Sequence, residues 1–487
     1  MAEVSAWAAE PPKRGHPVRR TVLLVLLAYV LYFLIGCLAP FAYHPEVSEE
    51  FQRSFDLDSF YGAASPDRAA LVLDNGDALD MRLRMIGEAK ERIILASFDM
   101  RDCESSRDIF AALLLAADRG VDIKILVDGA NGLISMSSKP MFRALGRLPN
   151  VEIKYYNTPN PLKPWTLNGR MHDKYVIVDD RLLLLGGRNT FDLFLGDYVS
   201  DDLKSHDQDV LVVNTYAGTA DRQSALFQVE NYFYSIWSGP YAQTHLDTQP
   251  LFPASTDAVE EDLRARYQAI YEERPGLFSP DEVDYTTYTV AVDKVTFLHN
   301  PTNILAKEPW VWWQIQQCAE AAEDRVVLMT PYAVLSEPMY DGLSRVADKT
   351  TLLLNSIAVG DNFVASSDYR FNRDKVLGTG ITVAEWFGDY SSHGKGALFD
   401  DDLSMVGSYN WDMRSTYIDT ELMLVFHGKE FAQQLKAHLD EMERSSLVAT
   451  TTGYLPKEGV EEKEGTGIKA ALLPITSILF QPFRFLL

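Results

Sequence analysis

Cysteine is scarce in this chain of 487 residues. Its three cysteines, Cys37, Cys103 and Cys318, cannot build a disulfide framework, and no two of them form a CxxC pair. We therefore expect neither thiol redox chemistry nor a thiolate zinc site. Disorder is excluded as well, because 47% of the residues are hydrophobic and only 23% are charged.

Basic residues are also in short supply. The chain has 45 Lys and Arg against 69 Asp and Glu, for a net charge of −24. A protein that binds nucleic acid normally presents a basic surface that replaces phosphate counterions, so the composition predicts no nucleic-acid partner. The length allows two or three domains, or one large duplicated unit.

One long stretch has no charge at all. Thr21 to Tyr43 covers 23 residues, enough to cross a bilayer, and lies between basic and acidic flanks. The flanking residues are Lys13, Arg14, Arg19 and Arg20 before it, and Glu46, Glu49 and Glu50 after it. We expect residues 1–45 to be a membrane anchor, with the N-terminus in the cytoplasm and the domains outside. Residues 34–37 (Leu-Ile-Gly-Cys) allow the alternative of a lipoprotein cleavage site with Cys37 as lipid anchor.

Two later stretches share one order of elements, which predicts an α/β fold with an internal repeat. Residues 1–45 contain four bases and two acids, so the rest of the chain, which contains both copies of the repeat, has a net charge of −26. We expect a first domain over 46–245, a linker over 246–290, a second domain over 291–450 and a linker with an apolar tail over 451–487. The predicted elements are a helix at 78–90, a strand at 92–98, a helix at 109–120 and a strand at 121–129, then a helix at 310–322, a strand at 325–332, a helix at 339–347 and a strand at 350–356.

Each copy ends in the same spaced motif, H-x-K-x4-D-x6-G-x-x-N. Two occurrences of this motif at equivalent places of a repeat are very unlikely to arise by chance. A further strand follows each motif and opens with Asp-x-acid, although the loop before it is longer in the first copy. The residues are His172, Lys174, Asp179, Gly186, Asn189 and then Asp209 in copy one, and His393, Lys395, Asp400, Gly407, Asn410 and then Glu421 in copy two.

The spacing separates chemical residues from structural ones. Residues i and i+2 share a face of a strand, so His172 and Lys174 are expected to project together. Asp179 has an odd offset and precedes a turn, so we expect it, like Asp400, to bond backbone groups. Gly186 and Gly187 give the chain room to bend, which would return Asn189 to the His/Lys face.

Two such half-sites suit phosphodiester chemistry. Lys and Asn side chains bind phosphate oxygens, one His can attack phosphorus, and the other can protonate the leaving oxygen. A carboxylate such as Asp209 or Glu421 could hold a His tautomer. The lysines neutralise the developing charge, so we expect no metal and no other cofactor.

At these residues the chain resembles the phospholipase D superfamily, over roughly residues 70 to 445, and within it the bacterial cardiolipin synthases. The stretch Gly407 to Ser415, with Ser408 as a further structural residue, is similar to their second motif, and Gly186 to Asn189 looks like a variant of the first. Two residues depart from the pattern: Gly187 stands where many relatives have Ser, and Asp419 where they have Asn.

The resemblance implies two α-β-α sandwich domains related by a pseudo-twofold axis, with one active site between them. It also implies transfer through a phosphatidyl-histidine. By family precedent His172 is the nucleophile and His393 the general acid, although the residues alone leave the two roles open.

We therefore expect a cardiolipin synthase-like transferase that uses phosphatidylglycerol, with phosphatidylethanolamine as a second candidate substrate. The alternatives are a phospholipase D hydrolase that releases phosphatidic acid, a nuclease-like phosphodiesterase, and a non-catalytic lipid-binding scaffold. The apolar stretch Gly467 to Leu487 is expected to lie in the membrane interface, with packing onto the folded body as the alternative. The oligomeric state stays open.

Overall fold

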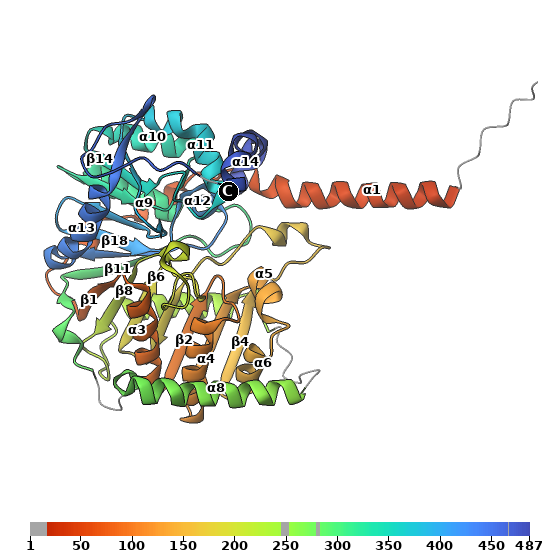
Figure 1. The fold of residues 1–487 in the computed structure, drawn as a ribbon, viewed down its shortest axis with the longest axis vertical. Coiled ribbons are helices and arrows are strands. Elements are labelled where there is room, and N and C mark those ends of the chain that lie inside the picture. Colours follow the sequence, from red (N-terminus) through yellow and green to blue (C-terminus); the bar gives the residue numbers. More distant parts are fainter. Residues whose placement is uncertain (1–16, 245–252, 279–282, 466) are drawn as a thin grey trace, which may run out of the picture.

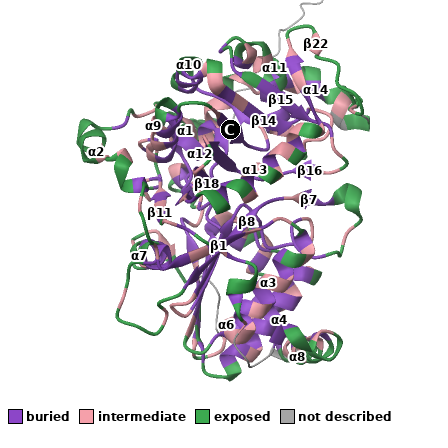
Figure 2. Cartoon of the chain, turned by 90° about the vertical axis from the view of Figure 1, so that its left-hand side faces the viewer, coloured by how far each residue is buried: buried purple, intermediate pink, exposed green. Residues whose placement is uncertain are grey.

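The computed structural model describes residues 17–244, 253–278, 283–465 and 467–487. Two α/β halves lie one above the other, and each is built on a nine-stranded sheet. The strands are mostly buried, whereas the outer helices expose one face (Figure 2). This arrangement confirms the predicted duplicated α/β fold.

The N-terminal elements begin with a long apolar helix. Its candidate membrane span, Val18–Phe41, has 24 residues, and Figure 1 shows the helix projecting from the body. Arg19 and Arg20 lie at its start, whereas Lys13 and Arg14 lie outside the described residues. The elements are α1 (Pro17–Leu38), η1 (Ala39–Phe41), α2 (Glu49–Ser54) and η2 (Leu57–Phe60).

The first half contains a β-α-β layer followed by the first motif. Its elements are β1 (Asp67–Val72), α3 (Asn75–Glu88), β2 (Arg92–Ser97), α4 (Glu104–Asp118), β3 (Asp122–Asp128), α5 (Gly129–Asn131), η3 (Gly132–Met136), α6 (Pro140–Gly146), β4 (Val151–Tyr156), η4 (Pro164–Leu167), β5 (Tyr175–Val178), β6 (Leu182–Gly186), η5 (Asp201–Leu203), β7 (Ser205–His206), β8 (Asp209–Asn214), α7 (Ala225–Trp237), β9 (Ala242–Gln243), α8 (Pro253–Glu273), η6 (Pro275–Phe278), η7 (Tyr285–Thr287) and β10 (Val290–Ala291).

The second half repeats the layer and adds a C-terminal helix. Its elements are β11 (Lys294–His299), α9 (Trp310–Ala321), β12 (Val326–Met329), β13 (Ala333–Val334), α10 (Glu337–Arg345), η8 (Ala347–Lys349), β14 (Thr350–Asn355), α11 (Phe363–Leu377), β15 (Thr382–Trp386), β16 (Ser391–Ser392), β17 (Gly396–Phe399), β18 (Leu403–Gly407), β19 (Trp411–Asp412), α12 (Met413–Tyr417), β20 (Leu422–His427), α13 (Lys429–Arg444), β21 (Ser446–Thr450), β22 (Gly453–Tyr454), α14 (Gly467–Leu479) and η9 (Gln481–Leu486).

The two sheets share one strand order. In the first, β1-β8-β6-β5-β2-β3-β4 run side by side, and in the second the same places are taken by β11-β20-β18-β17-β12-β14-β15. The strands β2, β3 and β4 are parallel, as are β12, β14 and β15. In both halves the motif hairpin, β5–β6 or β17–β18, pairs antiparallel beside the parallel strands.

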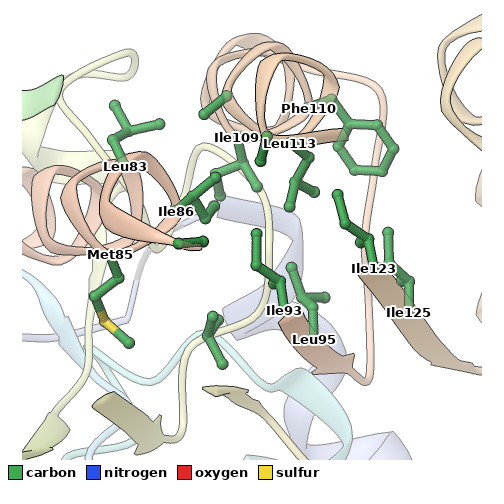
Figure 3. Packing of buried hydrophobic residues seen from close by; sticks show 14 of the residues in the cluster. Leu83, Met85, Ile86, Ile93, Leu95, Ile109, Phe110, Leu113, Ile123 and Ile125 are labelled. Atoms are coloured by element: carbon green, nitrogen blue, oxygen red, sulfur yellow. The ribbon is translucent and has the colours of Figure 1, made fainter. Parts of the chain in front are cut away.

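Hydrophobic cores hold the layers together. In the first half, side chains of α3 and α4 pack onto β2 and β3 (Figure 3). A second core lies between the halves and combines residues of both sheets with residues of α7 and α13. Helix α13 contacts β1 of the first half, and α7 contacts β11 of the second. The halves are therefore joined by a continuous apolar interface rather than by a few surface contacts.

The segment that we expected as a linker, 246–290, contains a regular helix. Helix α8 lies against α4 and α6, at the bottom of Figure 1, and buries Leu263 and Ile270 there. Strand β10 adds to the edge of the first sheet beside β1. Residues 245–252 and 279–282, which include the expected boundary at 245/246, lie outside the described part.

Candidate active site

Backbone pairs between the halves set the geometry of the site. Strands β7 and β16 pair in parallel and place His206 opposite Ser392. An isolated parallel bridge places Met171 opposite Thr420 in the same way. In each case the next residue along one chain segment is a motif histidine, and the next along the other is an acid.

Each motif histidine is therefore bonded to a carboxylate of the opposite half. His172 Nδ1 lies 2.8 Å from Glu421 Oε1, and His393 Nδ1 lies 2.6 Å from Asp207 Oδ2. A carboxylate at Nδ1 fixes the ring and its tautomer, and leaves Nε2 as the atom for chemistry. Two such imidazoles can serve as nucleophile and general acid.

Asp207 takes the place that we predicted for Asp209, and the sheet register gives the reason. Gly186 pairs with Asp209 in the first half, whereas Gly407 pairs with Met423 in the second. The residue equivalent to Glu421 is thus Asp207, two positions before Asp209. Matching the two Asp-x-acid patterns had shifted the alignment by two residues.

Asp209 itself is a buried structural acid. Its Oδ2 lies 2.9 Å from Arg82 Nη1 and 3.4 Å from Arg188 Nη1, and all three side chains are buried. Asp209 belongs to an ion cluster behind the first half-site rather than to the histidine pairs.

Gly187, the first departure from the family pattern, is explained by Asp207. A Cβ atom on Gly187 would collide with the Asp207 carboxylate. In the second half-site Ser408 stands at this position and its hydroxyl donates to Glu421. Ser415 donates to Glu421 as well, at 2.6 Å. Gly187 therefore leaves space for the Asp207 carboxylate, whereas Ser408 forms a hydrogen bond with Glu421.

The two acids differ in their electrostatics. Burial raises the pKa of Glu421, and Lys174 and the two serine hydroxyls oppose the rise. Burial alone would raise the pKa of Asp207 too, but Lys395 and His393 outweigh it and hold this pKa below its ordinary value. The acid beside His393 is thus the more firmly ionised of the two.

The histidines follow the same asymmetry. Burial, with the nearby Lys174 and Lys395, brings the pKa of His172 well below its ordinary value. Burial and Lys395 also lower the pKa of His393, but Asp207 counteracts them. His172 is accordingly suited to be a neutral nucleophile, and His393 is the better carrier of a proton.

Both lysines lie beside their own histidines. Lys174 Nζ donates to the His172 carbonyl at 2.6 Å, and Lys395 Nζ lies 3.5 Å from Asp207 Oδ2 and 3.3 Å from Nε2 of His393. Burial lowers the pKa of Lys174 to about 7 and lowers that of Lys395 as well. Both ammonium groups are desolvated, which strengthens their attraction for a phosphate.

The motif asparagines are buried at the same place. Among the described residues, the Oδ1 atoms of Asn189 and Asn410 have no hydrogen-bond partner. Amides that the protein leaves unsatisfied are available to a ligand. Gly407 allows the close approach of the Leu422 backbone that the second half-site requires.

Asp179 and Asp400 lie away from the histidines. The Asp179 carboxylate accepts from the backbone N–H groups of residues 90, 91 and 92, at 2.8 to 2.9 Å. Asp400 does the same for residues 323, 324 and 325 at 2.8 to 3.0 Å. Both have positive φ, 52° and 51°. Each closes its motif hairpin and ties it to the start of the neighbouring strand.

Sequence reasoning missed a set of residues around the first half-site. Thr420 Oγ1 accepts from the His172 N–H and donates to Asp173, which also accepts from Tyr232 at 2.9 Å. Burial raises the pKa of Asp173 to about 6. Position 173 lies inside H-x-K, where any residue is allowed, so the motif gave no signal for it.

Lys307 is a second missed residue. It is buried, and its Nζ has no hydrogen-bond partner within the described part of the chain. Burial lowers its pKa to about 8, against the influence of Asp419, Asp173 and Glu421. It lies in a loop outside both motifs, and only its placement in the fold connects it with the site.

Asp419, the second departure, is paired. Its Oδ1 lies 3.2 Å from Arg414 Nη1 and accepts from the Arg170 N–H at 3.2 Å. The guanidinium of Arg170 in turn bonds Asp128 at 2.9 Å. The additional acid is thus neutralised locally and adds little net negative charge to the site.

One hollow adjoins the His393–Asp207 pair, and a larger one lies nearby. A small cavity of about 230 Å³ is lined by Asp207 and Ser392, among others. A groove of about 550 Å³ is lined by residues of both halves, among them Ser205 and Asp361, which share a hydrogen bond of 2.8 Å, and it reaches α14 at Ala470 and Leu473. Its lining residues Ser205 and Ser391 come two positions before Asp207 and His393, so the groove lies close to that pair.

Known proteins resemble this chain in both halves. The family described as "Cardiolipin synthase, PLD-like domain" matches residues 83–192 and again 315–443, one match in each half. Cardiolipin synthase C of Escherichia coli K12 is 25% identical over 397 residues, which cover 73% of this chain and 80% of that protein. Cardiolipin synthase B of Salmonella typhi is 25% identical and covers 79% and 83%.

An uncharacterized protein of Helicobacter pylori J99 is 26% identical over 87% of this chain and 90% of its own length. Among solved structures, phosphatidylserine synthase of Haemophilus influenzae shares the fold with a TM-score of 0.62 and 13% identity, covering 90% of this chain and all of that one. Both halves, their shared strand order and the two family matches agree. The chain is a member of the phospholipase D superfamily, close to the cardiolipin synthases.

Proposed function

We propose that this protein is a phosphatidyltransferase that transfers a phosphatidyl group through a phosphatidyl-histidine and passes it to the glycerol hydroxyl of phosphatidylglycerol. The observation that carries the proposal is the pair of histidines, each fixed at Nδ1 by a carboxylate of the opposite half. Two lysines and two asparagines supply the charge and the polar groups for one phosphate between them.

The first step makes the covalent intermediate. His172 Nε2 attacks phosphorus, the bond from phosphorus to the leaving alcohol breaks, and His393 gives its proton to that oxygen. Glu421 holds the His172 ring in the attacking orientation. Lys174 and Lys395 stabilise the negative charge that gathers on the phosphoryl oxygens.

The second step reverses the first with a new alcohol. His393 takes the proton of the acceptor hydroxyl, the acceptor oxygen attacks phosphorus, and the bond from phosphorus to His172 breaks. Asp207 stabilises the imidazolium that forms at His393 in this step. One phosphate ester is exchanged for another, so the reaction needs no energy-rich co-substrate.

The roles of the two histidines rest on their surroundings. Burial brings the pKa of His172 well below its ordinary value, whereas the pKa of His393 is lowered against the opposing influence of Asp207, the acid whose own pKa is held low. This supports His172 as nucleophile and His393 as acid and then base. The proposed catalytic residues are His172, Lys174, Asn189, His393, Lys395, Asn410 and Glu421, with Asp207 in place of Asp209.

The choice of a lipid substrate is supported by the relatives and by α1. Two curated relatives that carry an activity name, those of Escherichia coli and Salmonella typhi, are cardiolipin synthases. The apolar helix α1 is long enough to hold the protein at a membrane, and Arg19 and Arg20 at its start favour a cytoplasmic N-terminus and an extracytoplasmic body. A lipid anchor at Cys37 would give the same location. Hydrolysis to phosphatidic acid is the second candidate, since water can replace the acceptor alcohol.

The test uses the purified full chain in vesicles of phosphatidylglycerol, with and without phosphatidylethanolamine. Lipid products are identified by mass spectrometry, and His172→Ala serves as the inactive control. Cardiolipin formed only by the intact protein is the expected result, and the released alcohol identifies the donor. Phosphatidic acid would make the protein a hydrolase, and no lipid turnover in either mixture would overturn the proposal.

A further inference from the structure

The most exposed aliphatic side chains outside α1 lie on three segments. These are the loop between β4 and β5 with Leu162 at its tip, the turn η3 with Ile134, and the outer face of α14. The exposed fractions are 74% for Leu162, 78% for Ile134 and 63% for Ile478 on α14. Helices α1, α14 and α5, which directly precedes η3, lie on the right-hand side of Figure 1.

These segments also lack acids. Residues 157–170, 129–139 and 467–487 contain no Asp or Glu, although the whole chain has 69. Among their bases Lys139 and Lys163 are exposed, whereas Arg170 and Arg484 bond Asp128 and Asp368. An otherwise acidic protein thus presents apolar, weakly basic segments on the side from which α1 leaves.

The loop after β4 runs alongside α1. Tyr29 donates its hydroxyl proton to the Pro161 carbonyl at 3.1 Å, and Tyr32 donates to the Leu162 carbonyl at 2.7 Å. Asn168 donates to the Cys37 carbonyl at 2.6 Å, closer to the body. The loop therefore follows the helix outward for at least two turns.

The position of these tyrosines places the loop tip below the membrane surface. A span of about 20 residues that starts after Arg20 ends near Pro40. At 1.5 Å per residue, Tyr32 then lies about 12 Å inside that end, and Tyr29 deeper still. If α1 crosses a bilayer, Pro161 and Leu162 share its depth.

The backbone of the tip is prepared for such surroundings. In hydrocarbon every polar backbone group needs a partner. Pro161 has no N–H, and its carbonyl and that of Leu162 are taken by the two tyrosines. The Leu162 N–H donates to Asn160 Oδ1 at 2.9 Å, and the Lys163 N–H to the Asn160 carbonyl at 2.8 Å. An exposed loop in water would need none of this.

We propose that the tip Pro161–Leu162, together with the outer face of α14, inserts into the leaflet that α1 enters and sets the mouth of the active site on the bilayer. The loop continues within ten residues to His172. Trp165 packs with Phe41 against the cluster of Met413, Tyr417 and Ile418, directly after the second motif. Helix α14 forms one wall of the groove between the halves.

The consequence for the proposed function, on which this part of the inference rests, is that a phospholipid reaches the histidines by lateral movement and keeps its acyl chains in the bilayer. The acid-free face also allows an acidic body to approach anionic lipid.

Insertion is tested without turnover. Single cysteines at Leu162→Cys, Ile475→Cys and Tyr216→Cys are introduced into a full chain that carries Cys37→Ser and Cys103→Ser, with the buried Cys318 retained. Each is labelled with an environment-sensitive fluorophore, and the protein is reconstituted into phosphatidylcholine–phosphatidylglycerol vesicles with brominated acyl chains. Tyr216 is the matched control, since it is exposed in the first half beyond the far end of β8.

Quenching by brominated lipid at positions 162 and 475, but not at 216, is the expected result. Quenching of position 162 by aqueous iodide to the extent seen at 216 would overturn the proposal. Protection from both quenchers would overturn it too, because protein and not lipid would then cover the tip.

A kinetic arm separates this inference from the proposed function. Leu162→Glu should lower turnover of long-chain lipid in vesicles by at least about tenfold more than turnover of a water-soluble short-chain phosphodiester, because a carboxylate is excluded from hydrocarbon. Tyr216→Glu should change neither. If the wild type turns over no lipid, the proposed function fails while the quenching result still decides insertion. Equal losses on both substrates would count against insertion.

Discussion

Asp207 and Glu421 each bond a histidine that is remote in sequence, 186 and 249 residues away. The individual buried acids of this protein are of two kinds. Asp207 and Glu421 face imidazole rings, whereas Asp209 faces two guanidinium groups. Substituting one acid of each kind should therefore give opposite phenotypes.

Asp207→Asn should retain the fold and lose activity by about 10⁴-fold, the scale seen when a histidine loses the carboxylate that orients it. Asp209→Asn should keep the His393–Asp207 bond but destabilise the fold by about 3–5 kcal/mol, because it leaves buried arginines unpaired. Steady-state kinetics and denaturant unfolding measure the two effects, with the exposed Asp341→Asn as a neutral control. An Asp209→Asn variant of normal stability and abolished turnover would return Asp209 to the reaction.

The pH dependence belongs to the scale of single residues as well. A pKa of about 7 for Lys174 means that it is charged in the free enzyme below this pH and neutral above it. For a soluble phosphodiester, kcat/KM should therefore fall as the pH rises through about 7, while kcat persists to higher pH because the bound anion raises the pKa of Lys174. Lys174→Arg, which stays charged, should move the alkaline limb upward. A limb that stays in place would assign it to another group.

Among the elements, those with strong periodicity could be predicted and those defined by packing could not. The expected helix at 310–322 is α9, and the one at 109–120 overlaps α4. Helix α8 has eight charged residues among its 21 and binds the first half partly through ion pairs, such as Arg266 to Asp108 at 2.5 Å, so its sequence resembles a charged connection. Its docking depends on α4 and α6, which no local pattern reveals.

The same limit applies to the site. The histidines, lysines and asparagines could be predicted because they recur at fixed spacing within one hairpin. Asp207 could not, since its role depends on the pairing of His206 with Ser392 across the two halves. Asp173 occupies the variable position of H-x-K, so the motif does not mark it. Lys307 lies outside both motifs, and only the fold brings it near Glu421 and Asp173.

At the scale of the whole molecule, the site is made by two halves of one chain. A continuous core and two sets of backbone pairs hold these halves together. Each half supplies one histidine to its own half-site and one acid to the other. Neither half therefore contains a complete histidine pair.

This arrangement predicts the outcome of mixing two inactive variants. His172→Ala and His393→Ala chains, co-expressed with different tags, should show no recovered activity, because each site draws both histidines from a single chain. Phosphodiester turnover of the doubly purified mixture measures this, beside each variant alone. Recovery to about one quarter of wild-type turnover per chain would instead indicate that halves exchange between chains, as in domain swapping.

The hydrogen bonds between each histidine and the acid of the opposite half also couple the evolution of the two halves. After an ancestral duplication, the sequences of the two copies could not change independently. A substitution at Glu421 alters the bond that orients His172, and one at Asp207 alters the bond that orients His393. Gly187 and Ser408 illustrate the freedom that was left: each accommodates its own acid in its own way. Related sequences should accordingly vary at these positions in matched sets, with each acid inherited together with the small residue beside it.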